Sequence, residues 1–162
     1  MSSSDFRESL GMRLRRAYLS MHRTYNAHFA QHGATADQFV ILTLLAEKDG
    51  IPQQELVRTA CSDPNTITVM LWLLEKRGLI RRTSHSQDGR ARCVYITPKG
   101  RTLQRKLDTG AEGLHARLRS AVPAGDAGRA LEHLQRIAEA MAPPPPRSRR
   151  RLADRDTAPA PR

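Results

Sequence analysis

The sequence predicts a mainly α protein with one small β-hairpin. Over most of the first 140 residues, apolar side chains recur every three or four positions, which is the spacing of amphipathic helices. Between Leu79 and Thr97 this spacing gives way to two short β-prone runs around a polar turn. The chain has 162 residues, enough for one sizeable hydrophobic core. We therefore expect a single folded domain over residues 1–142.

The first expected helix covers about Asp5 to Gln31. One of its faces is apolar and consists of Leu10, Leu14, Tyr18, Met21, Tyr25 and Phe29. After it, Thr35 and Gln38 have the spacing of a capping box and predict the start of a second helix. This helix is expected to stop at Asp49-Gly50, because glycine tolerates the left-handed backbone conformation that ends many helices.

Two short helices are then expected on either side of a tight turn. Pro52 suits the first position of a helix through Ala60, where a missing amide hydrogen costs nothing. Asp63 suits the N-cap of the next helix, with Pro64 directly behind it, and Gly78 closes that helix. This arrangement is a helix-turn-helix.

A basic hairpin and further helices follow. The runs LIRRT and ARCVYIT flank a turn centred on Asp88-Gly89 and predict the two strands of a hairpin that carries four arginines, turn included. Helical spacing returns from Pro98, and we expect a soft break and a bend at Gly110 and Gly113. A last helix ends at Met141, before PPPP. Residues 143–162 are expected to be disordered, because they contain too few apolar side chains to form a core.

The charge of the chain predicts a polyanionic partner. The formal net charge is +11, and the stretch from Arg58 to Lys106 carries 11 basic residues against three acidic ones. Such a surplus attracts nucleic acid or an anionic membrane face. No apolar run reaches the roughly 18 to 20 residues that a membrane span needs, and the start MSSSDFRESLGMRLRR has no apolar run of signal-peptide type. We therefore expect a cytoplasmic protein without a membrane partner.

Metal and redox chemistry are not indicated by the cysteines and histidines. Cys61 and Cys93 are too few for a disulfide framework and lack metal-ligand spacing, so we expect buried, inert thiols, no metal and no cofactor. Metal sensing by histidines that meet in space is an open alternative. The sequence has no Gly-rich phosphate loop, nucleophile elbow or zincin motif, so we expect no enzyme activity.

The hairpin also carries a resemblance to a known family. The run GLIRRTSHSQDGRARCVYITPKG, Gly78 to Gly100, resembles the wing of the multiple antibiotic resistance regulator (MarR) family, whose hallmark is an acid, any residue, then arginine. Here that motif is Asp88-Gly89-Arg90. The similar order of elements covers Asp5 to Met141 and implies a winged helix-turn-helix. The DNA-binding part would span about 35–100, and helices at about 5–31 and 98–141 would form a dimerisation arm.

The resemblance implies a sequence-specific transcription regulator that binds double-stranded DNA. It would be a ligand-responsive repressor that recognises a palindromic operator as a homodimer, with the helix from Asp63 to Arg77 in the major groove and the hairpin at the minor groove. Helical projection places Ile67, Met70, Leu71 and Leu74 against the core. The candidate DNA-binding residues are Asn65, Thr66, Thr68, Val69, Lys76, Arg81, Arg82, Asp88, Arg90 and Arg92.

Several alternatives stay open for these residues. Arg90 either contacts DNA or only pairs with Asp88 and holds the turn, and the other hairpin arginines either bind phosphates or form a solvated strand. The family tends to place a polar pair where this chain has Trp72 and Leu73. Trp72 either packs under the wing or against a neighbouring helix, or contacts a sugar or base. The apolar Trp72-Leu73 surface also fits a winged-helix adaptor for a partner protein.

The terminal helices and a possible effector complete the expectations. Apolar stripes at both chain ends lie outside the DNA-binding part, so they need either a second copy of the chain or, in a monomer, each other. The resemblance implies a small aromatic or anionic effector in a cleft beside the DNA-binding part. Candidate wall residues are Tyr18, His22, Tyr25, Phe39 and Trp72, and their alternative role is core packing.

Overall fold

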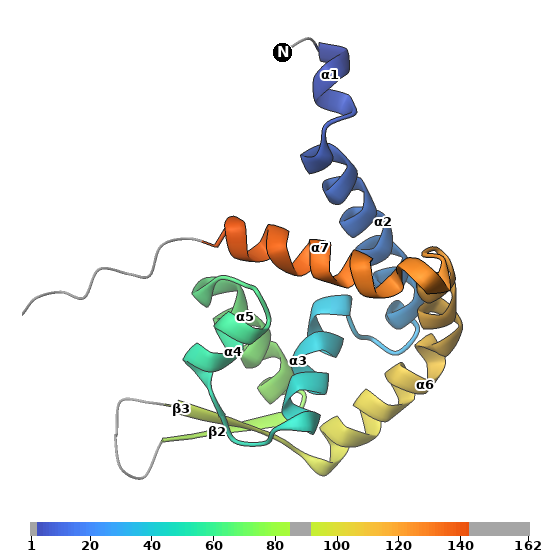
Figure 1. The fold of residues 1–162 in the computed structure, drawn as a ribbon. Coiled ribbons are helices and arrows are strands. Elements are labelled where there is room, and N and C mark those ends of the chain that lie inside the picture. Colours follow the sequence, from blue (N-terminus) through green and yellow to red (C-terminus); the bar gives the residue numbers. More distant parts are fainter. Residues whose placement is uncertain (1–2, 85–91, 143–162) are drawn as a thin grey trace, which may run out of the picture. The chain divides into compact units, whose positions relative to one another are not determined.

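The computed structural model describes residues 3–84 and 92–142. The chain forms two compact units, Met1–Leu118 and Arg119–Arg162. The expected turn at Asp88-Gly89 with Arg90, and the expected disordered tail, lie outside the described residues. Figure 1 shows the elements in chain order.

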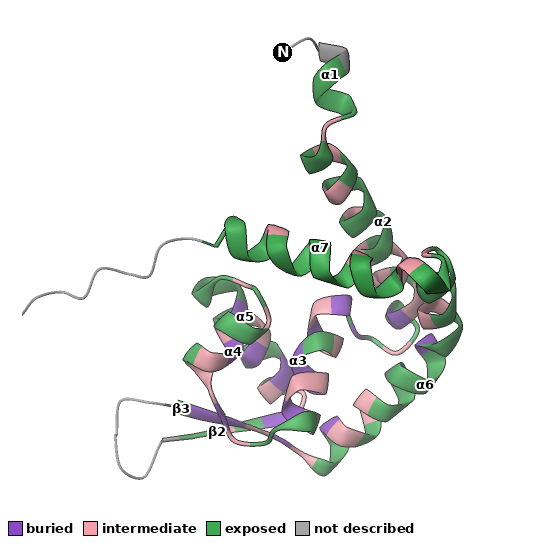
Figure 2. Ribbon diagram, in the orientation of Figure 1, coloured by how far each residue is buried: buried purple, intermediate pink, exposed green. Residues whose placement is uncertain are grey.

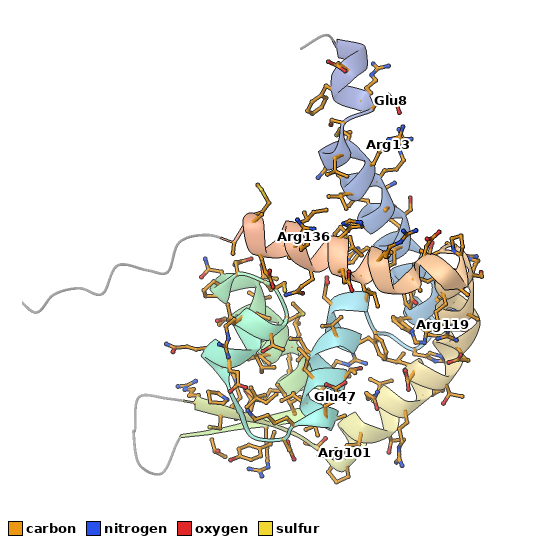
Figure 3. The ribbon with its side chains drawn as sticks, in the orientation of Figure 1. Glu8, Arg13, Glu47, Arg101, Arg119 and Arg136 are labelled. Carbon is orange, nitrogen blue, oxygen red and sulfur yellow. The ribbon has the colours of Figure 1, made fainter. Side chains whose placement is uncertain are left out.

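Two helices stand where one long helix from Asp5 was expected, so that expectation was wrong. They are α1 (Ser3–Arg7) and α2 (Leu10–Ala30). Ser9 lies between them in an extended conformation and is the N-cap of α2. Its hydroxyl group accepts a hydrogen bond from the Met12 amide at 3.4 Å and donates one to the Phe6 carbonyl at 2.7 Å. Serine stabilises such a break because its hydroxyl replaces helical backbone partners. Glu8 and Arg13 pair beside it (Figure 3).

The capping box of the next helix is confirmed. In α3 (Ala36–Glu47), the Thr35 hydroxyl accepts from the Gln38 amide at 3.1 Å, and the Gln38 side chain accepts from the Thr35 amide at 3.4 Å. The helix ends two residues before Asp49. The Asp49 carboxylate instead accepts from the Ile96 amide at 2.9 Å and from Arg101 at 3.1 Å. This acid therefore ties the end of α3 to the last strand of the hairpin and to the helix that follows it.

A short strand that the sequence did not indicate precedes the helix-turn-helix. β1 (Ile51–Pro52) pairs antiparallel with the later strand β3 (Arg92–Ile96), with Ile51 opposite Val94. Pro52 is consequently the N-cap of α4 (Gln53–Thr59) and not its first helical residue. The physical reason is tertiary, because pairing with β3 buries Ile51 in the core and holds Pro52 in an extended conformation.

The helix after the turn and the hairpin agree with the sequence. α5 (Pro64–Lys76) begins at Asp63, whose carboxylate accepts from two backbone amides, and Gly78 beyond it has a φ of +68°. β2 (Ile80–Ser84) and β3 (Arg92–Ile96) pair antiparallel, in a sheet of order β1-β3-β2. Helices α3, α4 and α5 followed by this sheet are a winged helix-turn-helix, as the sequence predicted (Figure 1).

A long helix follows the hairpin. α6 (Pro98–Ser120) is continuous through Gly110 and Gly113, so the expected break is wrong. Packing explains one of the two glycines, because a Cβ at Gly110 would lie 3.3 Å from Nε2 of His28 on α2. Close approach of the two helices buries Leu107 and Ala111 with Phe29.

The hydrophobic core lies mainly beneath the helix-turn-helix. Fully buried side chains from α3, α4, α5 and the sheet form it, among them Leu42, Leu56 and Leu71. In Figure 2 the buried residues concentrate on these elements, while much of α1 and α2 is exposed. A smaller cluster around Phe29 joins α2 to α6. The DNA-binding part of the predicted fold therefore has its own core.

The second unit contains a short 3-10 turn (Ala124–Asp126) and α7 (Ala127–Ala140). As expected, α7 ends just before the prolines. Its apolar stripe is exposed, with Leu131 at 68% and Leu134 at 53% of their full accessibility. None of the helices within residues 3–84 and 92–142 is long and apolar enough to cross a membrane.

The contact between α6 and the start of β2 generates a stability prediction. A Cβ at Gly100 would overlap the Leu79 carbonyl oxygen, whereas a Cβ at Gly113 in the same helix meets open space. We expect Gly100→Ala to lower the free energy of unfolding by about 1 to 3 kcal/mol through overpacking. Gly113→Ala, the matched control, should raise it by up to about 1 kcal/mol. Urea denaturation measures both, and equal effects would contradict the close approach.

Candidate functional site

The outer face of α5 is the surface that the sequence assigned to DNA. Ile67, Leu71 and Leu74 are fully buried and Met70 is half-buried, which confirms the predicted inner face. The opposite face is exposed and consists of Asn65, Thr66, Thr68, Val69, Trp72, Leu73 and Lys76. The helix is thus anchored along one stripe, and its other side is open to a partner.

The hydroxyl groups at the start of α5 are held by the protein. The Thr66 hydroxyl donates to the Asp63 carboxylate at 2.5 Å, and this bond lowers the pKa of Asp63. The Thr68 hydroxyl donates to the Pro64 carbonyl at 2.7 Å and accepts from Nε2 of Gln53 at 3.0 Å. Because both hydroxyl protons point into the protein, these threonines meet a ligand as hydrogen-bond acceptors.

Gln53 is a member of this surface that the sequence analysis missed. It is the first residue of α4 and lies 3.0 Å from Thr68, so it extends the polar face of α5 onto the neighbouring helix. Its position at the start of the helix before the tight turn was visible in the sequence. Its contact with Thr68 depends on how α4 and α5 pack, which local patterns do not specify.

Trp72 lies half-exposed on the outer face of α5. Its side chain is 51% exposed, and Nζ of Lys76 lies 5.0 Å from its ring centroid. Such cation–π contacts hold a lysine over an aromatic face at an exposed site. Trp72 therefore lies on the outer face of α5 together with its positive neighbour.

The arginines of the hairpin have three different environments. The Arg82 side chain is only 13% exposed, and its Nε lies 2.9 Å from the Glu75 carboxylate, which also accepts from the Arg82 backbone amide at 3.1 Å. This pairing lowers the pKa of Glu75. Arg81 lies over the Tyr95 ring at 4.1 Å, and Arg92 is exposed. Asp88 and Arg90 lie outside the described residues.

The three environments favour different roles for these side chains. Arg82 joins β2 to α5 through Glu75, a contact that the sequence analysis did not include. Arg81 and Arg92 keep their charge at the surface of the hairpin. The structure thus brings the polar start of α5 and a basic hairpin together in one unit (Figure 1).

A cavity of about 420 Å³ lies behind α5. Four of the five residues predicted to line a ligand cleft do line it, namely Tyr18, His22, Tyr25 and Phe39. Trp72 is not a lining residue, because it is on the outer face of α5. The inner face of α5 forms another wall through Ile67 and Met70. Asp37 and His115 supply further polar groups, and neither was among the predicted lining residues.

The two cysteines differ from each other. Cys93 is buried, as expected, but Cys61 is exposed, so that part of the expectation was wrong. Cys61 has a φ of +50° because it forms the tight turn between α4 and α5, and this conformation directs it away from the core. Among the described residues, no group of His, Cys, Asp and Glu side chains could hold a metal ion.

Comparison with known proteins identifies the family. Residues 34–91 match the model of the MarR family. The transcriptional regulator HosA from Escherichia coli O157:H7 is 31% identical over 116 residues, which are 68% of this chain and 76% of HosA. The chain belongs to the MarR family. The resemblance that the hairpin motif carries is thereby confirmed.

Other relatives of this MarR-family chain agree. TtmR from Methylorubrum extorquens, an HTH-type transcriptional regulator, is 34% identical over 86 residues, which are 53% of this chain and 44% of TtmR, so the match spans less than half of that protein. The repressor CouR of Rhodococcus jostii, solved on a 23-mer DNA duplex, superposes with a TM-score of 0.75 at 29% identity. That superposition covers 85% of this chain and 98% of CouR.

The Glu75–Arg82 pair generates a prediction about pH. Because the folded protein lowers the pKa of Glu75 below the usual glutamate value of about 4.3, ionised Glu75 stabilises the fold above that value and loses this effect as the pH falls through the folded pKa. We expect Glu75→Gln to destabilise the protein at neutral pH, and the difference from the parent chain to shrink below about pH 4. Urea denaturation across this range measures it.

A double-mutant cycle assigns the effect to the ion pair. In an Arg82→Met background, Glu75→Gln should change stability much less, since the charge partner is already missing. A pH-independent effect of Glu75→Gln, or one that is the same in both backgrounds, would show that the pair does not hold the hairpin.

Proposed function

We propose that this protein is a ligand-responsive transcription repressor that binds a palindromic DNA operator as a homodimer. One observation carries the proposal. The same helix, α5, presents exposed polar side chains on one face and lines a cavity with its other face through Ile67 and Met70. A small molecule in the cavity would therefore touch the helix that reads DNA.

Relatives support the DNA and repressor parts of this proposal. CouR is described as a transcriptional repressor bound to DNA, and Rv2887 of Mycobacterium tuberculosis, 28% identical over 109 residues, is named a transcriptional repressor. The homologues are transcriptional regulators, and the proposal includes no catalytic activity. A repressor of this kind acts where the DNA is, so we place it in the cytoplasm.

The proposed contacts follow from the geometry of α5 and the hairpin. Asn65 would bond base edges or phosphates, and Val69 would meet a thymine methyl in the major groove. Thr66 and Thr68 would accept hydrogen bonds from base amino groups, since their own hydroxyl protons are held by the protein. Arg81, Arg92 and Lys76 would neutralise phosphates, and Arg82 would hold the hairpin in place. Asp88 and Arg90 keep the role at the minor groove that the family motif implies.

Exposed apolar stripes support the homodimer. Leu10, Tyr18 and Met21 on the N-terminal helices are exposed, as are Leu131, Leu134 and Met141 in the second unit. Burying such side chains against a second copy would stabilise each by about 1.5 to 3 kcal/mol. We propose that helices at about 5–31 and 98–141 form the dimer, and that two-fold symmetry presents two copies of α5 to a palindrome.

A second function is favoured by one feature of α5. Val69, Trp72 and Leu73 form an exposed apolar strip beside the polar residues. Tryptophans that become buried on binding are frequent anchors of protein interfaces, so this exposed strip also fits an adaptor that binds a partner protein. Weak DNA binding that does not depend on salt would favour the adaptor.

The DNA contacts generate a prediction with two variants. Asn65→Ala should cost about 1 to 3 kcal/mol at particular base pairs and relax the preference there. Arg92→Ala should weaken all sites alike and reduce the slope of log affinity against log salt by about 1. Selection of sites from a random duplex library, followed by salt titration on the selected sites, measures both.

Arg13→Ala is the charge-matched control. Arg13 lies near the start of α2 and pairs with Glu8, away from the hairpin in the same unit (Figure 3). It should leave both the base preference and the salt slope unchanged. If the control weakens binding as much as Arg92→Ala, the net charge and not the hairpin determines affinity, and the assignment of this surface fails.

The dimer generates a further prediction. Leu134→Lys places a charge on the exposed apolar stripe of α7, where the proposed dimer would bury it. We therefore expect the mass of the protein in solution to fall from that of a dimer toward that of a monomer. Gln135→Lys adds the same charge to the neighbouring position outside the stripe and should leave the dimer intact. Light scattering after size-exclusion chromatography measures the mass. A parent protein that is monomeric at micromolar concentration would rule out the proposed pairing.

A further inference from the structure

The charge of the cavity behind α5 restricts what it binds. Among the described residues that line it, Asp37 supplies the one carboxylate, and none is a lysine or an arginine. The remaining polar side chains on its walls are those of Tyr18, His22, Tyr25, Ser62 and His115. An anionic group that enters this space meets a like charge and no cationic partner among the described lining residues. The cavity therefore has the charge of a site for cations or hydrogen-bond donors.

The hydrogen bonds around His22 assign the protons of this cluster. The side-chain oxygen of Asn26 accepts from the Ala36 amide at 2.7 Å, which directs the Asn26 NH2 group toward Nδ1 of His22 at 3.1 Å. An NH2 group only donates, so Nδ1 of His22 accepts and the ring proton lies on Nε2. Nε2 lies 3.1 and 3.2 Å from the two Asp37 oxygens and donates to them. In this arrangement the His22 ring accepts at Nδ1 and donates through Nε2 to the Asp37 carboxylate.

Asp37 has room for a second donor. The Asp37 side chain is 50% exposed. Because Asp37 is the second residue of α3, the capping box of Thr35 and Gln38 fixes its backbone. His22 supplies one N–H bond to a group that has several acceptor positions. A ligand in the cavity can therefore donate to Asp37 without displacing His22.

The other walls suit a planar aromatic molecule. The ring centroid of His115 lies 5.6 Å from that of Tyr25 and 6.4 Å from that of Phe39, and both pairs have an interplanar angle of 31°. Met21 and Met70 add flexible side chains that adapt to an irregular ligand. Aromatic faces attract cations and stack on planar groups. The shape of the cavity thus favours a planar aromatic ring, and its charge favours a cationic group on that ring.

We propose that the effector is a planar aromatic cation, with an amine or amidine group that donates to Asp37, and that the cavity discriminates against aromatic carboxylates. This inference rests on the proposed function only in calling the bound molecule an effector. Of the expected ligands, which were aromatic or anionic, it keeps the aromatic ones, assigns them a positive charge and drops the anionic ones. Ile67 and Met70 carry the effect of binding to α5, since both line the cavity.

Three probes of one size and three charges test this inference. Benzamidine, benzamide and benzoate are a cation, a neutral amide and an anion on the same ring. Calorimetry at about pH 8, above the usual histidine pKa of about 6.5, measures each with the full chain. We expect benzamidine to bind about tenfold or more tightly than benzoate, with benzamide between them. Asp37→Asn, which keeps the shape of the side chain, should remove the preference for benzamidine.

Glu47→Gln is the matched control, because it removes one carboxylate from the same helix outside the cavity. It should keep the order of the three probes. Benzoate binding as tightly as benzamidine would overturn the proposal, as would an unchanged order in Asp37→Asn or the absence of binding by all three probes. DNA affinity of the parent protein is measured separately, so a failure to bind DNA would refute the regulator function and leave the ligand class standing.

Discussion

The burial of α5 along one stripe is the constraint on which the rest of the structure depends. Ile67, Leu71 and Leu74 have no exposed surface, and each contributes roughly 1.5 to 3 kcal/mol of apolar burial. A helix fixed in this way has no freedom to rotate about its axis. Asp63 fixes where the helix begins, so Asn65, Thr66 and Thr68 must lie on the exposed side.

The hairpin depends on the same helix. A two-stranded hairpin alone is at best marginally stable in water. Here β1 adds a third strand, and the Arg82–Glu75 pair joins β2 to α5 through both a side chain and a backbone amide. The charges of the hairpin are consequently held in a fixed relation to the polar face of α5. Such preorganisation lowers the entropic cost of binding a rigid duplex.

The cavity gives the anchored helix a second role. Met70 and Asp37 line both the cavity and a shallow groove that Asn65 and Thr66 also line, so these two side chains border both spaces. A ligand shifts a conformational equilibrium only by its difference in affinity for the two states. Contact with α5 itself is a direct source of that difference, because moving the helix changes the shape of the cavity.

The sequence by itself determined the winged helix-turn-helix between flanking helices, the inner and outer faces of α5, and the family. Local signals carried this information: the capping pairs at Thr35 and Asp63, the glycine after α5 and the hairpin motif. Only the tertiary structure decided that Pro52 belongs to a strand and that Arg82 pairs with Glu75. It also decided that Gln53 belongs to the outer surface of α5 and Asp37 to the cavity. Their partners lie 7 or more residues away or on other elements, and periodicity reports which face of a helix is buried but not which side chain it meets.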